Sequence, residues 1–188
     1  KTTIIIVTKE NRSVKGNIEV FKIGEQLVGT KTDEQGNIQF VYDKLPVDGA
    51  TFILEADEDI YSADNQKDLI YSKRQKIEEL TTENGYAISK DLPLGKYSIY
   101  EKTAGDGFVL NKEVKHIELK YENENIPIVF ENIDYENQRQ KVDLNVIKKD
   151  KETDTLLKGA VFGLYASEDI YGIENATRSM TLLIEKGT

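Results

Sequence analysis

The chain has 188 residues, with 25 Lys and Arg against 34 Asp and Glu, so its formal net charge is −9. This acidic balance argues against nucleic acid or an anionic membrane as a partner, because both require a cationic protein surface. The absence of Cys excludes disulfides, thiolate metal sites and Cys nucleophiles, and a single histidine, His116, leaves no His-rich metal site. We therefore expect no cofactor and no metal. No apolar run approaches the length that spans a membrane.

Alternating apolar side chains predict short strands along most of the chain. In chain order, the alternating sets are Ile18-Val20-Lys22, Ile38-Phe40-Tyr42, Phe52-Leu54-Ala56, Tyr97-Ile99-Glu101 and Ile128-Phe130-Asn132. Turn signals separate these sets, and Asn84-Gly85 is typical of a tight hairpin. Residues 65–79 have a weak periodicity that fits a helix or an extended loop. Many short strands separated by turns predict an all-β sandwich.

An internal repeat predicts how the chain is organised. Residues 49–61 return as residues 159–171 with nine of thirteen positions identical, and the pattern that ends at Lys22 returns as Leu144-x-Val146-x-Lys148. The first match has an offset of 110 residues and the second an offset of 126 residues. They differ because the first copy contains an insertion within residues 24–43, which could form an extra hairpin. We therefore expect one complete module over residues 17–141 and the first part of a second over residues 142–188. Residues 1–16, strand-like at 3–8, would be a linker or the tail of a preceding module in a tandem array.

Three polar side chains continue strand faces that are otherwise apolar: Lys22, Glu101 and Asn132. If these faces point into the core, the three groups should lie together, because an isolated buried charge is costly. Burial disfavours the charged forms of an amine and of a carboxyl alike. A neutral amine is a nucleophile, and a protonated carboxyl can polarise an amide and carry a proton to its nitrogen. The expected product is an isopeptide bond between Lys22 and Asn132, formed with loss of ammonia.

Longer motifs extend this pattern. They are residues 16–22, Leu45-x-x-x-Gly49-Ala50-x-Phe52, residues 82–86, Leu92-Pro93-x-Gly95-x-Tyr97-x-x-x-Glu101, residues 107–110 and residues 129–132. Together they resemble the Cna protein B-type domain, also called the SpaA-type prealbumin-like domain, of Gram-positive surface proteins and pilins. The resemblance implies immunoglobulin-like (prealbumin-like) β-sandwich modules. It also implies a cross-link between Lys22 and Asn132, with Glu101 as the catalytic residue.

Other readings of these residues stay open. Asn137 is a rival of Asn132, because Glu136-Asn137 aligns with Glu10-Asn11 at the repeat offset; Asn132 is preferred because its strand alternates more clearly. Taken singly, each residue fits a plain surface role, and the cross-link is favoured only by the three together. In the second copy, Lys148 is the matching lysine, and its glutamate would fall beyond residue 188, so we expect no second bond within this chain.

The predicted function is structural. We expect a stalk or adhesin repeat of a Gram-positive, cell-wall-anchored surface protein, located outside the cell and stabilised by a cross-link that the chain forms once on itself. It would therefore not be an enzyme that turns over. The expected partners are neighbouring modules of the same chain and the cell wall, reached through a sortase signal outside this segment. The alternatives are a module that binds a host extracellular matrix protein, through residues 24–43 or 57–79, and a polymerising pilin subunit.

Overall fold

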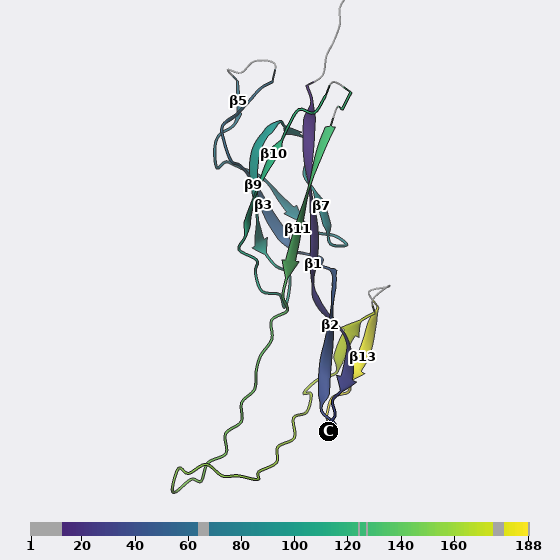
Figure 1. The fold of residues 1–188 in the computed structure, drawn as a ribbon, viewed down its shortest axis with the longest axis vertical. Coiled ribbons are helices and arrows are strands. Elements are labelled where there is room, and N and C mark those ends of the chain that lie inside the picture. The colour runs from purple at the N-terminus through teal and green to yellow at the C-terminus, as the bar shows by residue number, and fades with distance from the viewer. Residues whose placement is uncertain (1–12, 64–67, 124, 127, 175–178, 188) are drawn as a thin grey trace, which may run out of the picture. The chain divides into compact units, whose positions relative to one another are not determined.

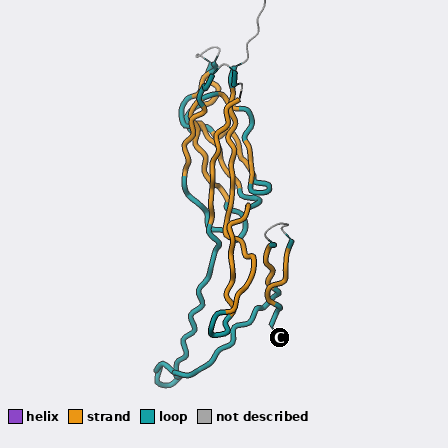
Figure 2. The backbone as a smooth tube through the Cα atoms, turned by 45° about the vertical axis from the view of Figure 1, so that its right-hand side comes forward, coloured by secondary structure: helices purple, strands orange, loops and turns teal. Residues whose placement is uncertain are grey.

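The computed structural model describes residues 13–63, 68–123, 125–126, 128–174 and 179–187. Strands and loops make up these residues, and no helix occurs among them (Figure 2). The chain divides into two compact units. Of the described residues, the first unit holds those up to Ile23, Pro46–Asp106 and Leu110–Asn137, and the second holds Gly24–Leu45, Gly107–Val109 and those from Gln138 onward. The long strand β1 (Lys15–Thr32) contributes to both units.

The first unit is a sandwich of two layers of strands (Figure 1). In one layer, β1 pairs with β7 (Tyr86–Ile88), β8 (Leu92–Pro93) and β11 (Ile128–Asn137). The other layer has the order β10-β9-β3-β6, with bounds β10 (Val114–Leu119), β9 (Gly95–Thr103), β3 (Thr51–Ala56) and β6 (Lys76–Thr81). A short hairpin, β4 (Ile60–Tyr61) with β5 (Leu69–Tyr71), completes the unit. The all-β sandwich predicted from the sequence is confirmed.

The core lies between these layers and comes from alternate residues of each strand, since successive side chains of a strand point to opposite faces. The predicted faces at residues 18–22, 52–56 and 97–101 are all buried. Among the largest side chains that are fully enclosed are Ile18, Phe52, Leu54, Leu92, Tyr97, Ile99 and Tyr135. The core therefore follows the alternation of the sequence on β1, β3 and β9.

On β11 the predicted phase is wrong. Ile128, Phe130 and Asn132 are exposed, while Val129 and Ile133 are buried. The period of a strand is two, so a shift of one residue sends every side chain to the opposite face. Both phases of this strand carry apolar residues, and alternation alone could not choose between them.

The sequence also makes predictions for residues 65–79 and for the turn at Asn84-Gly85. In residues 65–79, the described part forms no helix; β5 and the start of β6 lie there, and β6 pairs along β3. The Asn84-Gly85 turn is present, with φ of 52° and 71° and mutual backbone hydrogen bonds between Glu83 and Tyr86, but the hairpin expected there does not form, because β6 and β7 belong to different sheets. Positive φ at both central positions is why this turn selects Asn-Gly. The turn carries the chain from β6 in one sheet to β7 in the other.

The second unit begins with the insertion seen in the sequence. The far half of β1 and β2 (Ile38–Pro46) form a hairpin, as expected for residues 24–43. Farther along the chain, β12 (Ile170–Ile173) pairs with β13 (Met180–Ile184). Between residues 142 and 165 many apolar side chains are exposed, among them Val142, Leu144, Val146, Leu156, Val161, Phe162, Leu164 and Tyr165. No helix long and apolar enough to cross a membrane occurs in the part of the chain that the structure describes.

Candidate cross-linking site

Three strands bring a lysine, a glutamate and an asparagine together inside the first unit. Lys22 comes from β1, Glu101 from β9 and Asn137 from the end of β11. The side chains of Lys22 and Glu101 have 0% exposure, and their Nζ and Oε1 atoms are 3.7 Å apart. The Asn137 amide Nδ2 donates to both carboxylate oxygens of Glu101, at 2.9 and 2.8 Å. Glu101 therefore lies between an amine and a carboxamide that the sequence separates by 115 positions.

Lys22 is held by its backbone. Its N–H donates to the carbonyl of Gly85 at 2.7 Å, and its own carbonyl accepts from Val47 N–H at 3.0 Å. The side chain continues the face of Ile18 and Val20 and thus points into the core. The backbone fixes where the amine enters the sandwich, and the strand period fixes the direction in which it points.

The other two residues are positioned by the opposite layer and by a loop. Glu101 pairs with Phe52 across the β3–β9 ladder, and its Oε2 also accepts from the backbone N–H of Asn111 at 2.8 Å. Asn137 follows Tyr135 on the same face of β11. The Tyr135 hydroxyl donates to the carbonyl of Ile99 at 2.8 Å, which ties β11 to β9 two residues before each site residue.

Burial controls the charge of the amine. Loss of water around Lys22 lowers its pKa below the usual range for lysine, and the attraction of Glu101 opposes this shift without cancelling it. The Lys22 Nζ also donates to the carbonyl of Ile23 at 2.9 Å. A lowered pKa raises the fraction of neutral amine, which is the form that can attack a carbonyl carbon.

The carboxamide has an unused acceptor. Asn137 Oδ1 is buried and has no hydrogen-bond partner among the described residues. A buried carbonyl without a donor costs about 1–3 kcal/mol. The amide of Asn137 thus directs its nitrogen to the carboxyl group of Glu101 and leaves its carbonyl oxygen without a donor.

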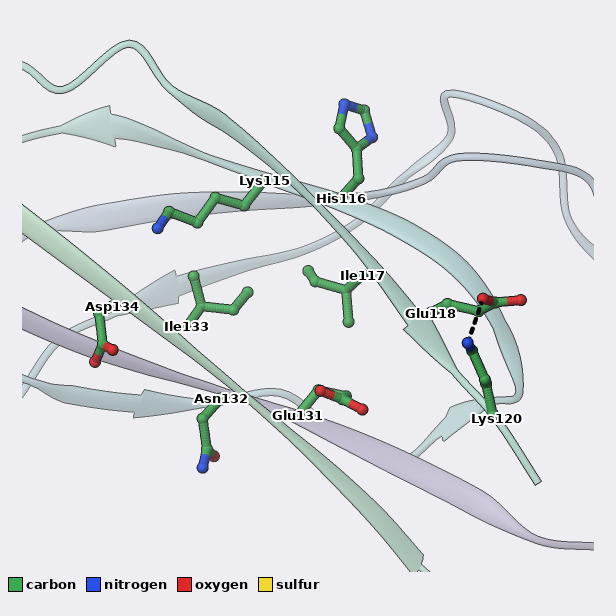
Figure 3. Close-up of a pocket in the computed structure, with 9 residues that line it drawn as sticks. All are labelled: Lys115, His116, Ile117, Glu118, Lys120, Glu131, Asn132, Ile133 and Asp134. Atoms are coloured by element: carbon green, nitrogen blue, oxygen red, sulfur yellow. Dashed lines mark ion pairs between the residues drawn. The ribbon is translucent and has the colours of Figure 1, made fainter. Parts of the chain in front are cut away.

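The structure assembles two of the preferred site residues and replaces the third. Lys22 and Glu101 meet as expected, but Asn132 is exposed on β11, beside a surface pocket of about 470 Å³. Figure 3 shows Asn132 and Asp134 pointing to one side of β11 and Ile133 to the other. The contacts therefore favour the alternative, Asn137, over Asn132, and the identity of the cross-linked asparagine stays a prediction.

The sequence contained two signals for Asn137. The set Ile133-x-Tyr135-x-Asn137 alternates as well as the one that ends at Asn132, and the repeat aligns Glu136-Asn137 with Glu10-Asn11. Asn11 lies outside the described residues. Lys148, the matching lysine of the second copy, is exposed.

The chain belongs to the SpaA prealbumin-like fold domain family, whose match covers residues 25–134. This confirms the resemblance found in the sequence. The match includes Glu101, whereas Lys22 and Asn137 lie just outside its two ends. Among curated proteins, none matches this chain.

Several solved structures are similar. The minor pilin of Streptococcus agalactiae shares 15% identity over 72% of this chain and 49% of its own, with a TM-score of 0.44. The full-length major pilin SpaD of Corynebacterium diphtheriae shares 20% identity over 66% and 30%, with a TM-score of 0.40. A streptococcal ancillary pilin shares 18% identity over 97% and 48%, with a TM-score of 0.40. This chain thus spans less than half the length of each of these three structures.

Proposed function

We propose that this chain is a structural segment of a Gram-positive pilus or cell-wall-anchored surface protein, and that its first unit is stabilised by a self-formed isopeptide bond between Lys22 and Asn137. Membership of the prealbumin-like family supports the structural role and an extracellular location. The observation that carries the cross-link is the enclosed cluster of Lys22, Glu101 and Asn137. Ion pairs of this kind are expensive to bury, so a purely stabilising role explains the cluster poorly.

The reaction balances without a cofactor. The neutral amine of Lys22 attacks Cγ of Asn137, a C–N bond forms, and the carbonyl becomes tetrahedral. Glu101 takes a proton from the attacking nitrogen and delivers a proton to Nδ2, which it already contacts at 2.8 and 2.9 Å. The bond from Cγ to Nδ2 then breaks and ammonia leaves. One amine and one carboxamide become a secondary amide, and Glu101 is unchanged.

The test is the intact mass of the purified chain. Loss of ammonia removes about 17 Da, so the wild type should weigh that much less than its sequence mass if Lys22 attacks as proposed. Glu101→Gln preserves the size of the side chain but removes the acid, and Asn137→Ala removes the acceptor. Both variants should show the full sequence mass.

Asn132→Ala is the matched control, because it removes the same side chain five residues away on an exposed face. It should retain the mass deficit, and peptide mapping should find Lys22 joined to Asn137. A wild type at full sequence mass would overturn the cross-link, and a deficit lost only in Asn132→Ala would assign the acceptor to Asn132.

A further inference from the structure

The chain that leaves β11 is bound on one side by a short loop. Val109 N–H donates to the carbonyl of Gln138 at 2.9 Å, and Gln140 N–H donates to the carbonyl of Gly107 at 2.8 Å. Phe108 and Arg139 form an antiparallel bridge between these two bonds. Residues 138–141 are therefore held immediately after the last strand instead of leaving as a free linker.

The base of the inserted hairpin holds the same segment through a carboxylate. Glu25 Oε2 accepts from the backbone N–H of Arg139 at 3.1 Å and pairs with Lys141 Nζ at 2.9 Å. Hydrogen bonds from Lys141 and from the Arg139 amide lower the pKa of Glu25 below its usual range. One side chain of β1 thus contacts two positions of the departing chain.

Aromatic rings add a third set of contacts. The Arg139 guanidinium lies 5.2 Å from the centroid of the Phe108 ring, and Lys141 Nζ lies 4.7 Å from that of Tyr42 on β2. Both distances are within the range of cation–π attraction. Gly107 has φ of +78°, and a Cβ there would meet the Arg139 guanidinium carbon at 3.0 Å, so the loop approaches the segment closely.

The internal repeat shows that this arrangement is specific to the first copy. Glu25 is three residues after Lys22, and the residue three after Lys148 is Lys151, which has the opposite charge. The second copy also lacks the insertion that makes the long hairpin. Around Lys151 the chain instead makes a tight turn, with Asp150 N–H donating to Thr155 O at 2.9 Å.

We propose that the β1–β2 hairpin is a docking surface for residues 138–141 of its own chain, with Glu25 as the clamp. We call this arrangement the exit clamp. Tension applied beyond Lys141 would first load the clamp and the Gly107–Val109 bridge, and only then the end of β11 at Asn137. The exit clamp does not require the isopeptide bond, and it gives the insertion a role other than binding a host ligand.

Trypsin tests the exit clamp directly, because Arg139 and Lys141 are themselves cleavage sites. Cleavage of a native protein follows the population that is locally open. Glu25→Ala removes both contacts and should raise the cleavage rate after Arg139 and Lys141 by roughly threefold to tenfold, the scale of an exposed ion pair with a hydrogen bond. Glu25→Gln keeps an acceptor for the Arg139 N–H but loses the charge. Its cleavage rate should therefore lie between those of the wild type and of Glu25→Ala.

Glu34→Ala is the matched control. It removes the same charge from the turn of the same hairpin, at an exposed residue, and should leave both cleavage rates at the wild-type level. Hydrogen exchange at the Gln140 amide should accelerate in Glu25→Ala and not in Glu34→Ala. Equal rates in the two alanine variants would overturn the exit clamp. So would an even rise of cleavage at all Lys and Arg sites, because that pattern reports general loss of stability.

Discussion

Lys22 shows how burial determines the chemistry of a single residue. Its side chain is fully enclosed, its pKa is lowered chiefly by the loss of water, and its Nζ lies 3.7 Å from Oε1 of Glu101. In water the same amine would be protonated and unreactive at neutral pH. The reactivity proposed for it therefore comes from the surrounding strands and not from the residue type.

The lowered pKa of Lys22 predicts a pH dependence of stability in a variant that cannot cross-link. In Asn137→Ala, the unfolded chain binds more protons at Lys22 than the folded chain does, at any pH between the two pKa values. The free energy of unfolding should therefore rise with pH up to the usual lysine range, by at most about 1.4 kcal/mol per pH unit for one proton. Urea unfolding of Asn137→Ala at several pH values between 7 and 10 measures this slope.

The double variant Asn137→Ala with Lys22→Met provides the comparison, because it differs only at the titrating group. Groups that do not contact Lys22 titrate equally in both proteins, including Tyr97 and Tyr135, whose pKa values are raised by burial. The difference between the two slopes isolates the coupled pair of Lys22 and Glu101. Parallel slopes would show that Lys22 keeps its ordinary pKa in the folded chain.

At the scale of elements, the turn between β6 and β7 sets the position of the amine. Gly85 has φ of +71°, and its carbonyl accepts the Lys22 N–H. A Cβ on Gly85 would lie 2.6 Å from the Lys22 carbonyl oxygen and 2.6 Å from Cβ of Pro46. The tight turn is thus the contact that aligns β1 with the chain arriving from β6.

Gly85→Ala should therefore destabilise the fold by about 1–3 kcal/mol, from the positive φ and the steric contact together. It should also lower the yield of the cross-link, because the shift acts on the backbone of Lys22. Gly29→Ala is the control, since a Cβ there meets nothing within 4 Å. Thermal unfolding and intact mass of the two variants give both quantities, and an unchanged melting temperature in Gly85→Ala would contradict the steric argument.

The strands also show what alternation can and cannot predict. On β1, β3 and β9 one phase is apolar and the other is mixed, so Ile18, Phe52 and Ile99 were placed correctly from the sequence. On β11, Phe130 and Tyr135 belong to opposite phases and are both aromatic. Phe130 is exposed, whereas the Tyr135 ring packs on Phe52 with 4.8 Å between the ring centroids. This tertiary contact decides which face of β11 is buried.

At the scale of the whole molecule, the proposed bond closes a loop of 115 residues between the first and last strands of the sandwich. By analogy with a disulfide, this closure would stabilise the folded state by about 5 kcal/mol, because it removes freedom from the unfolded chain. Guanidinium unfolding of the wild type and of Glu101→Gln should differ by about that amount. Similar unfolding midpoints would mean that the bond adds little, even if the mass deficit is present.

The division into a complete module over 17–141 and a second over 142–188 stays a prediction, as does binding of a host matrix protein. The pairing of β12 with β13 agrees with the repeat, since Ile170 and Tyr171 match Ile60 and Tyr61 of β4, whose partner is β5. The exposed Phe162 and Leu164 correspond to Phe52 and Leu54, which β6 and β9 flank in the first copy. An apolar segment of this kind would need equivalent neighbours to be buried.

The sequence by itself determined the all-β class, the Asn-Gly turn, the inserted hairpin and two members of the site, because strand period and turn chemistry are local properties. Lys22 and Glu101 stand out as polar residues at the ends of clearly apolar faces. The choice of Asn137 over Asn132, the enclosure of the amine and the contacts of Glu25 with residues 138–141 were decided only by the tertiary structure. The choice of asparagine depends on which of two equally apolar faces of β11 packs against the opposite sheet. The enclosure of the amine and the contacts of Glu25 depend on residues far apart in the sequence. No local sequence pattern encodes these long-range contacts.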